Sequence, residues 1–368
     1  MQEPSSINYS KVIKSLYIIG ALFIITYIIT LSINLSQESA TKAGSIGDAL
    51  GGLANPFIGT MGVVLTFFAF WVQFEANERQ RKDIQRERFE NKFYELLRLH
   101  KENVNEIEIN EVKLKGRPCF PSFLKEIYAI HSIIDHYCDK LESIYFQNFD
   151  DRIKFSFNLF YNGVTGDRIN SKLHKSNIKL DDNSLFIQKI LEAINVASFR
   201  LRKDYYNNIG GPDEFDSILK DLKDMEFDYK PFIGHGAQLG HYFRHLYQMV
   251  KFVDQSQAIT MDQKKNYLKT LRAQLSNHEQ AILYLNSLVN PGNKLWYDKN
   301  DETGEISRYI IDYKLIKNLP FHLVDFTTHP KEKLKQELKK AYPNKDEKWH
   351  MEYVNNSFEE LENQTTPP

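Results

Sequence analysis

Two long apolar stretches without any charged residue lie near the N-terminus, and they constrain this chain more than any other feature. They cover residues 15–37 and 49–74. A helix needs about 20 apolar residues to cross the roughly 30 Å of hydrocarbon in a bilayer. The sequence therefore predicts two transmembrane helices, at about 14–35 and 54–74, within a membrane anchor at 1–74.

A cleaved signal peptide and a buried hairpin are the two alternatives to a membrane anchor for these stretches. A signal peptide has a shorter apolar region than residues 15–37 and a small-residue cleavage site after it. A buried hairpin would belong to a soluble domain, but two such stretches are seldom neighbours in soluble proteins. Transmembrane helices are therefore the preferred interpretation.

Basic residues are unevenly distributed around the two stretches. Lys11 and Lys14 precede the first stretch, and only Lys42 lies between the two. Beyond the second stretch, five basic residues are predicted to contact lipid headgroups: Arg79, Arg81, Lys82, Arg86 and Arg88. Because positively charged flanks stay in the cytoplasm, both chain ends are predicted to be cytoplasmic. A solvated helix face with salt bridges is the alternative role of the basic run.

The segment between the two stretches is rich in small residues. Gly47 and Gly51 have the spacing that lets membrane helices approach closely and form oligomers, and a flexible external turn is the alternative. We expect Asp48 to cap the second membrane helix. Pro56 fits the first turn of that helix, where its missing N–H is harmless.

The remaining chain is predicted to be a mainly α-helical cytoplasmic part. Only 17 Gly and 12 Pro occur in 368 residues, so chain breakers are few. A juxtamembrane helix at 75–110 carries an apolar stripe whose partner is either the C-terminal domain or, as a coiled coil, a second subunit. An all-α domain is expected at 111–327, and a charged helical segment with a disordered tail at 328–368. The net charge of −1 provides no overall basic field for nucleic acid.

Several segments of the domain have helical periodicity. Residues 152–164 fit both a strand and a helix, and we predict a helix because no partner strand is nearby. Residues 241–254 and 264–289 are predicted to form two antiparallel helices, the second with apolar residues stepping by three and four. Two further helices are expected at 330–340 and 346–361.

The residue types present disfavour several chemistries. No phosphate-binding P-loop occurs, and two cysteines, Cys119 and Cys138, are too few for a disulfide-dense scaffold or a structural zinc site. No metal and no cofactor are therefore expected. Gly234, Gly236 and Gly240 precede a helix and could cradle an anion, but a plain loop is the preferred interpretation.

Four residues near this glycine-rich segment are candidates for an interaction or a ligand: His235, His241, Arg244 and His245. His241 and His245 share one helix face and could bind a metal. The residues between them are Tyr-Phe-Arg, so the zincin motif is absent. Packing and hydrogen bonding are the preferred roles of the pair.

Arg272 and His278 have a spacing that resembles the motif of the HEPN ribonucleases. In that chemistry the arginine stabilises the charge on the phosphorane and the histidine transfers the proton. On one ideal helix, however, six residues leave the two side chains about 120° apart. They would meet only in a bent helix or a dimer, and His278 also falls on the apolar stripe, where a core histidine is the alternative.

Several blocks of the chain together resemble one protein family. They are GSIGDALGGLANPFIG, RERFENKFYELLRLHKENVNEI, GHYFRHLYQMVKFVD, LRAQLSNHEQAILYLNSL and YKLIKNLPF. From Gly44 to Phe321 the chain resembles the putative phage abortive infection protein family. The resemblance implies a bacterial inner-membrane protein that acts in defence against phage. It implies no catalytic residue, because the family has none established.

Three functions remain open at this point. The preferred one is an antiphage defence protein without intrinsic catalysis. Its helical domain would sense infection or bind a phage protein or an operon-encoded partner, and it would act as a homo-oligomer in contact with inner-membrane lipids. The second is a membrane-tethered, metal-independent ribonuclease that uses Arg272 and His278 on RNA. The third is a scaffold for a separately encoded defence enzyme.

Overall fold

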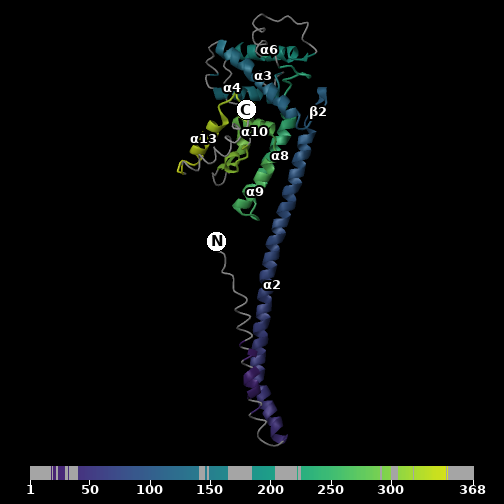
Figure 1. Ribbon diagram of the computed structural model, residues 1–368, viewed down its shortest axis with the longest axis vertical. Helices are drawn as coiled ribbons and strands as arrows, with labels where there is room; N and C mark the ends of the chain where they lie inside the picture. The colour runs from purple at the N-terminus through teal and green to yellow at the C-terminus, as the bar shows by residue number, and fades with distance from the viewer. Residues whose placement is uncertain are drawn as a thin grey trace, which may run out of the picture. The chain divides into compact units, whose positions relative to one another are not determined.

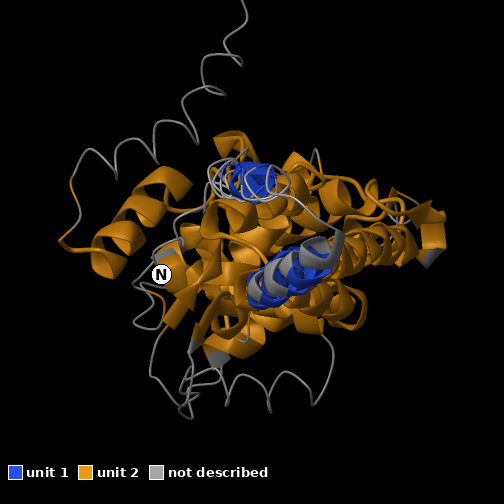
Figure 2. Ribbon diagram, turned by 90° about the horizontal axis from the view of Figure 1, so that it is seen from below, with its two compact units in different colours: residues 1–83 blue, residues 84–368 orange. Residues whose placement is uncertain are grey.

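The computed structural model describes most of the chain after residue 40 and isolated positions before it. The described residues are 18, 20, 21, 24–29, 32, 40–140, 146, 149–164, 185–203, 222, 225–290, 292–299, 306–317, 319–344 and 346. The chain divides into two compact units, Met1–Asp83 and Ile84–Pro368, which Figure 2 colours separately.

The first unit contains the first part of a long helix. Helix α2 runs from Ala40 to Glu106, and its residues up to Asp83 belong to this unit. Within the described residues, its part Ala54–Glu106 is the one helix long and apolar enough to cross a membrane, and an 18-residue window of it has a mean hydropathy of 1.8 and no buried residue. The apolar section of this helix is residues 54–74, which carry no charged side chain. The exposed apolar side chains of this section include Phe57, Ile58, Val63, Phe67, Phe70 and Phe74. Such a surface is unfavourable in water and suits hydrocarbon.

The other predicted span, at 14–35, lies mostly outside the described residues. The longest described piece of it, residues 24–29, is helical with exposed side chains. One candidate span is therefore present in the described part of the chain, and the two-span layout is not confirmed.

The segment between the predicted spans differs from the expected external turn. Because α2 begins at Ala40, Gly47, Asp48 and Gly51 lie inside the helix, and Asp48 does not cap it. Pro56 is likewise internal to the helix rather than in its first turn. The prediction of a break before the second span relied on the glycines of this segment. A glycine destabilises a helix interior by only about 1 kcal/mol relative to alanine, so the helix can continue through them.

Hydroxyl groups in the apolar section form hydrogen bonds within the helix. The Thr60 hydroxyl donates to the Pro56 carbonyl at 2.7 Å, and the Thr66 hydroxyl donates to the Gly62 carbonyl at 2.8 Å. A polar group in hydrocarbon has no water to bond and must find a partner in the protein. These two bonds make the section compatible with a lipid environment.

In the second unit, the final part of α2 packs against the same chain. Its buried stripe consists of Phe89, Phe93, Leu97, His100 and Val104. The Phe89 ring stacks on Phe252 with centroids 5.1 Å apart, and the Tyr267 hydroxyl donates to Glu90 at 2.7 Å. The sequence left open whether this stripe packs against the C-terminal domain or a second subunit, and the structure shows it packed against the C-terminal domain.

Short strands and helices follow α2 in the described part of the second unit (Figure 1). They are β1 (Glu108–Ile109), η1 (Asn110–Val112), β2 (Leu114–Lys115), α3 (Cys119–Lys140), α4 (Phe149–Asn162) and α6 (Leu185–Arg200). The strands β1 and β2 pair antiparallel. Helix α4 confirms the helix predicted at 152–164.

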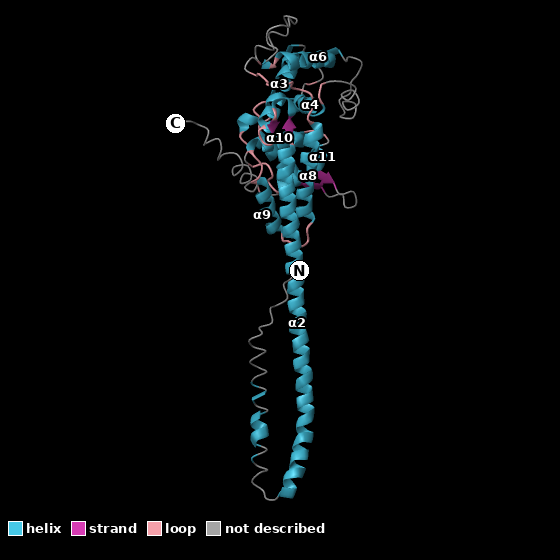
Figure 3. Cartoon of the chain, turned by 90° about the vertical axis from the view of Figure 1, so that its right-hand side faces the viewer, coloured by secondary structure: helices cyan, strands magenta, loops and turns pink. Residues whose placement is uncertain are grey.

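The remaining described helices and strands of the second unit begin with α8. Its elements are α8 (Gly236–Gln255), α9 (Met261–Arg272), α10 (Asn277–Leu288), α11 (Gly292–Trp296), β3 (Tyr297–Lys299), β4 (Ile306–Arg308), α12 (Tyr309–Asp312), η4 (Phe321–Leu323) and α13 (Pro330–Ala341). The strands β3 and β4 form a second antiparallel pair. As Figure 3 shows, helices dominate and the strands are short, so the mainly α prediction is confirmed.

The single helix predicted at 264–289 is two helices in the structure, which corrects that prediction. Helix α9 ends at Arg272, and Ser276 begins α10 with a capping box. The Ser276 hydroxyl accepts from the Glu279 N–H at 3.2 Å, while the Glu279 carboxylate accepts from the Ser276 N–H at 2.7 Å. The S-x-x-E pattern of residues 276–279 is the sequence signature of this break.

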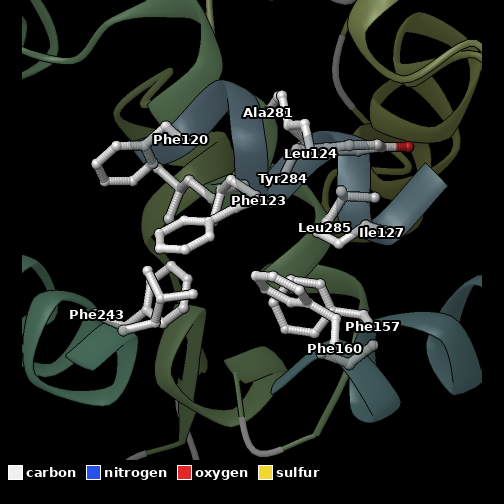
Figure 4. Close-up of a cluster of buried hydrophobic side chains, with 14 of the residues drawn as sticks. Phe120, Phe123, Leu124, Ile127, Phe157, Phe160, Phe243, Ala281, Tyr284 and Leu285 are labelled. Carbon is white, nitrogen blue, oxygen red and sulfur yellow. The ribbon is translucent and has the colours of Figure 1, made fainter. Parts of the chain in front are cut away.

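The core of the second unit is rich in aromatic side chains contributed by several helices. Figure 4 shows α3, α4, α8 and α10 contributing Phe123, Phe160, Phe243 and Leu285. The rings of Phe123 and Phe160 meet edge to face with centroids 5.7 Å apart. At the C-terminus, α13 confirms the helix predicted at 330–340, whereas all of the segment predicted at 346–361 except Asp346 lies outside the described residues.

Candidate functional site

The glycine-rich entry to α8 allows two chain segments to approach closely. Gly163 and Gly234 have φ angles of +83° and +93°, and a Cβ atom on Gly234 would lie 2.5 Å from the Gly163 nitrogen. A Cβ atom on Gly236 would lie 2.7 Å from the Tyr161 carbonyl oxygen. The end of α4 thus covers the start of α8. Gly234 lies in the loop before α8, whereas Gly236 and Gly240 lie within the helix, so the expectation that all three glycines precede it is wrong.

A buried carboxylate holds the chain just before α8. Glu126 of α3 accepts hydrogen bonds from the Tyr229 hydroxyl at 2.7 Å and from the Phe232 N–H at 2.8 Å. The His235 Nε2 lies 3.0 Å from the same carboxylate. Burial, followed by the Glu126 charge, raises the pKa of Tyr229 far above its usual range, so its proton stays in place. His235 thus contacts the same carboxylate as Tyr229 and the Phe232 N–H, and sequence reasoning missed its partner Glu126.

Helix α8 presents different chemistry on two opposite faces. Successive residues of a helix are about 100° apart around its axis. Gly240, Phe243 and Arg244 therefore share one face, which lines a cavity. Tyr242 and His245 share the opposite face, where both rings lie near or against His100 of α2.

The second of these faces belongs to a polar cluster formed by His100, Arg117, Tyr242, His245 and Glu279. The His100 ring centroid lies 5.5 Å from that of Tyr242 and 6.2 Å from that of His245. The Arg117 Nε lies 3.3 Å from a carboxylate oxygen of Glu279, which is completely buried. Electrostatic interaction also links Tyr242 to Glu279 and Arg117.

Most polar atoms of the cluster have no hydrogen-bond partner in the part of the chain that the structure describes. They are both ring nitrogens of His100 and His245, the Tyr242 hydroxyl and the Glu279 Oε1. Each unpaired buried group of this kind destabilises a fold by about 1–3 kcal/mol. The rest of the core must offset this cost.

Burial determines the protonation states in the cluster. It lowers the pKa of His100 to about 4, with the charges of His245 and Arg117 acting in the same direction. Burial, followed by His241, also lowers the pKa of His245. Burial, followed by Glu279, raises the pKa of Tyr242 well above its usual range. Near neutral pH the two imidazoles are therefore neutral and the tyrosine keeps its proton.

The first face of α8 lines a cavity of about 560 Å³. The cavity lies between α4, α8, the end of α10 and α11, and its lining includes the basic residues Arg244 and Lys294. Cavities that bind small molecules measure roughly 300–1,000 Å³. The structure thus separates the four predicted interaction residues. Of the four, Arg244 alone lines this cavity, and His241 is exposed. His235 contacts Glu126, and His245 belongs to the polar cluster around His100.

No metal site is found among the described residues, because no three His, Cys, Asp or Glu side chains there are grouped so that they could hold an ion. His241 and His245 remain neighbours on α8. Burial raises the pKa of both Cys119 and Cys138 to about 11, so both thiols stay protonated near neutral pH.

Arg272 and His278 lie on different helices. Arg272 is the last residue of α9, and its Nη1 donates to the Lys314 carbonyl at 2.8 Å. His278 is half-buried in the first turn of α10, and burial, followed by His322, lowers its pKa. The expectation of one long helix carrying both residues is therefore wrong, while their joint action on RNA stays a prediction.

The predicted lipid-contact residues are all exposed, in keeping with either of their predicted roles. Arg79 pairs with Glu75 at 2.6 Å, Arg81 with Glu78 at 3.4 Å, and Arg86 with Glu90 at 2.9 Å. Within the described ranges Lys82 and Arg88 form no ion pair. Exposed pairs of this kind contribute about 0–1 kcal/mol and leave the arginines available to other anions.

The glycines predicted to pack membrane helices have open space around them. A Cβ atom on Gly47 or Gly51 would meet no atom within 4 Å. Their role in oligomer formation therefore stays a prediction that concerns a second copy of the chain or residues outside the described part.

Comparison with known proteins points to one family. No curated protein matches the chain, and no solved structure does so. The family model described as putative phage abortive infection protein matches residues 234–324, a shorter extent than the sequence blocks suggested. The matched residues include α8, α9 and α10, and with them Arg244, Tyr242, His245 and Glu279. Residues 234–324 thus confirm the resemblance of this chain to the putative phage abortive infection protein family.

Proposed function

We propose that this protein is a membrane-anchored antiphage defence protein that acts by abortive infection at or from the bacterial inner membrane. The family match over residues 234–324 is the observation that carries the defence role. The exposed apolar section of α2, with its internally bonded hydroxyls, supports the anchor. The exposed basic residues that follow this section support contact with anionic lipids.

In this proposal the helical domain senses infection or binds a partner. Helix α8 supports it, because one face lines the cavity and the other meets His100 of α2. Since α2 also carries the apolar section, a change at α8 would act directly on the helix of the anchor. The trigger is either a phage protein or an operon-encoded partner, and action as a homo-oligomer is part of the proposal.

Phage plating on cells that carry this gene alone tests the proposal. We expect fewer plaques than with an empty vector, together with death of infected cells before phage release. A membrane-potential dye added during infection reports whether the effector acts on the membrane. Plaque numbers equal to those of the vector control, across a broad phage panel, would contradict the defence role.

The same assay separates this mechanism from the two alternatives. Full protection by Arg272→Ala and His278→Ala variants, at wild-type protein levels, would exclude the ribonuclease. Full protection by the lone gene would exclude a scaffold that needs a separately encoded enzyme. Loss of protection in both point variants while the protein stays folded would contradict a mechanism without catalysis.

A further inference from the structure

The cavity beside α8 has an excess of positive charge. Arg244 comes from α8 and Lys294 from α11, and none of the thirteen lining residues is acidic. Within the described ranges neither side chain forms a hydrogen bond or an ion pair. A guanidinium group binds phosphate or carboxylate through paired hydrogen bonds, and an ammonium group adds a point charge. The cavity is therefore suited to an anion.

Another large cavity of the second unit is lined by residues of both charges. That cavity, of about 570 Å³, is lined by residues of α4, α10, β4 and α13 and contains both Asp150 and Lys333. Asp150 and Lys333 form an ion pair at 2.6 Å inside it. The full lining contains the basic residues Lys154, Arg308, Lys333 and Lys340 and the acidic residues Asp150 and Glu337, so part of its positive charge is offset inside the cavity, whereas no acidic residue lines the cavity beside α8.

The lining beside α8 also has an aromatic wall. Phe157 and Tyr161 of α4 stack with centroids 6.2 Å apart and an interplanar angle of 19°. Phe243 of α8 adds a third ring, and Figure 4 shows it facing the α4 aromatics across the core. Phe157 and Phe243 are only 1% and 2% exposed, so the partly exposed ring of Tyr161 is the aromatic surface on which a flat ring system can stack.

Amide groups complete the lining of the cavity. Asn158, Asn162, Asn286 and Asn290 all line it, and each amide offers donors and an acceptor. Asn286 is already engaged, because its Oδ1 accepts from the Trp296 indole N–H at 3.0 Å. Asn158 and Asn290 have no side-chain hydrogen bond within the described ranges and are available to a ligand.

We propose that this cavity binds a small anionic molecule with an aromatic ring system, which is the chemistry of a nucleotide. Arg244 and Lys294 bind its phosphate, the Tyr161 ring stacks on the flat ring system, and the free asparagine amides bond to the ring edges. The proposal does not depend on the defence role, since it concerns binding to the purified protein. Failure of phage protection and failure of binding are therefore separate results.

Isothermal titration of the purified full-length protein in detergent micelles tests this proposal. The probes are AMP, GMP, CMP, UMP and the four nucleoside triphosphates. Adenosine, which lacks the phosphate, and inorganic phosphate, which lacks the ring system, are the controls. We expect at least one nucleotide to bind, and adenosine and inorganic phosphate to bind at least tenfold more weakly than it does. Absence of binding by every nucleotide at millimolar concentration would overturn the proposal.

Three cavity variants and one matched control locate the binding site. Arg244→Gln and Lys294→Gln each remove one charge, and we expect at least tenfold weaker nucleotide binding in both. Lys269→Gln removes an exposed lysine of α9 that does not line the cavity, and it should bind like the wild type. Asn290→Trp places a large side chain in the lining and should also block binding. Nucleotide binding that is unchanged in all three cavity variants would show that the site is elsewhere.

Discussion

Two buried tyrosines allow the same chemical change to be made in opposite hydrogen-bonding environments. Tyr229 and Tyr242 are 4% and 1% exposed. The Tyr229 hydroxyl donates to the buried Glu126 carboxylate, whereas the Tyr242 hydroxyl has no partner in the described part of the chain. Replacing each by phenylalanine removes one oxygen atom and leaves the ring packing in place.

The two substitutions are expected to change the free energy of unfolding in opposite directions. Tyr229→Phe takes a donor from a buried charge, which costs about 1.5–3 kcal/mol. Tyr242→Phe removes a hydroxyl that was desolvated without a bond, so we expect a gain of about 1 kcal/mol. Because neither change leaves a large cavity, packing contributes little to the difference.

Urea unfolding of the full-length protein in detergent micelles, followed by near-UV circular dichroism, measures both variants at neutral pH. Tyr94→Phe, at a tyrosine that is 54% exposed, is the matched control and should stay within about 0.5 kcal/mol of the wild type. An equal loss of stability in Tyr229→Phe and Tyr242→Phe would refute the reasoning. It would mean that the two hydroxyls have equivalent partners.

Three further predictions concern the fold around α8. The His100 pKa of about 4 lies below that of an unfolded histidine, so stability is present above about pH 6.5 and is lost as pH falls. Between pH 7 and pH 5 His100 should account for a loss of about 2 kcal/mol, and His100→Phe should flatten the measured pH profile of urea unfolding by that amount. Ser276→Ala removes half of the capping box with Glu279 and should lower the free energy of unfolding by about 1 kcal/mol. Gly234→Ala should cost more than Ser276→Ala in the same assay, because its Cβ would meet the Gly163 nitrogen at 2.5 Å in a left-handed backbone region.

Patterns of short range in the sequence predicted many elements of the fold. The stripe that contains Phe89 and Phe93 has a helical period, and both side chains are buried. The pattern could not identify the partner of the stripe, because Phe252 and Tyr267 are far away in the sequence. The break between α9 and α10 was predictable from the capping box that begins at Ser276, which the apolar periodicity across it concealed.

The candidate site was less accessible to sequence reasoning because its groups come from distant segments. Glu126 lies 109 positions from His235, and no local motif links the two. The cavity combines residues of α4, α8 and α11, so a pattern within α8 could single out Arg244 but not Lys294. The spacing of Arg272 and His278 was a local pattern, and it did not reveal that a helix ends between them.

Phage protection by a variant with a disrupted apolar section is the most direct test of a membrane-anchored defence protein. The double variant Val64→Arg and Phe67→Arg places two charges in the exposed apolar section of α2, each unfavourable by about 2.5–3.5 kcal/mol at the centre of a bilayer. Ile84→Arg, at an exposed position of α2 beyond that section, is the matched control. We predict that wild type and control sediment with membranes and reduce plaque numbers, while the double variant does neither. Full protection by a double variant that is present in the soluble fraction would contradict the account.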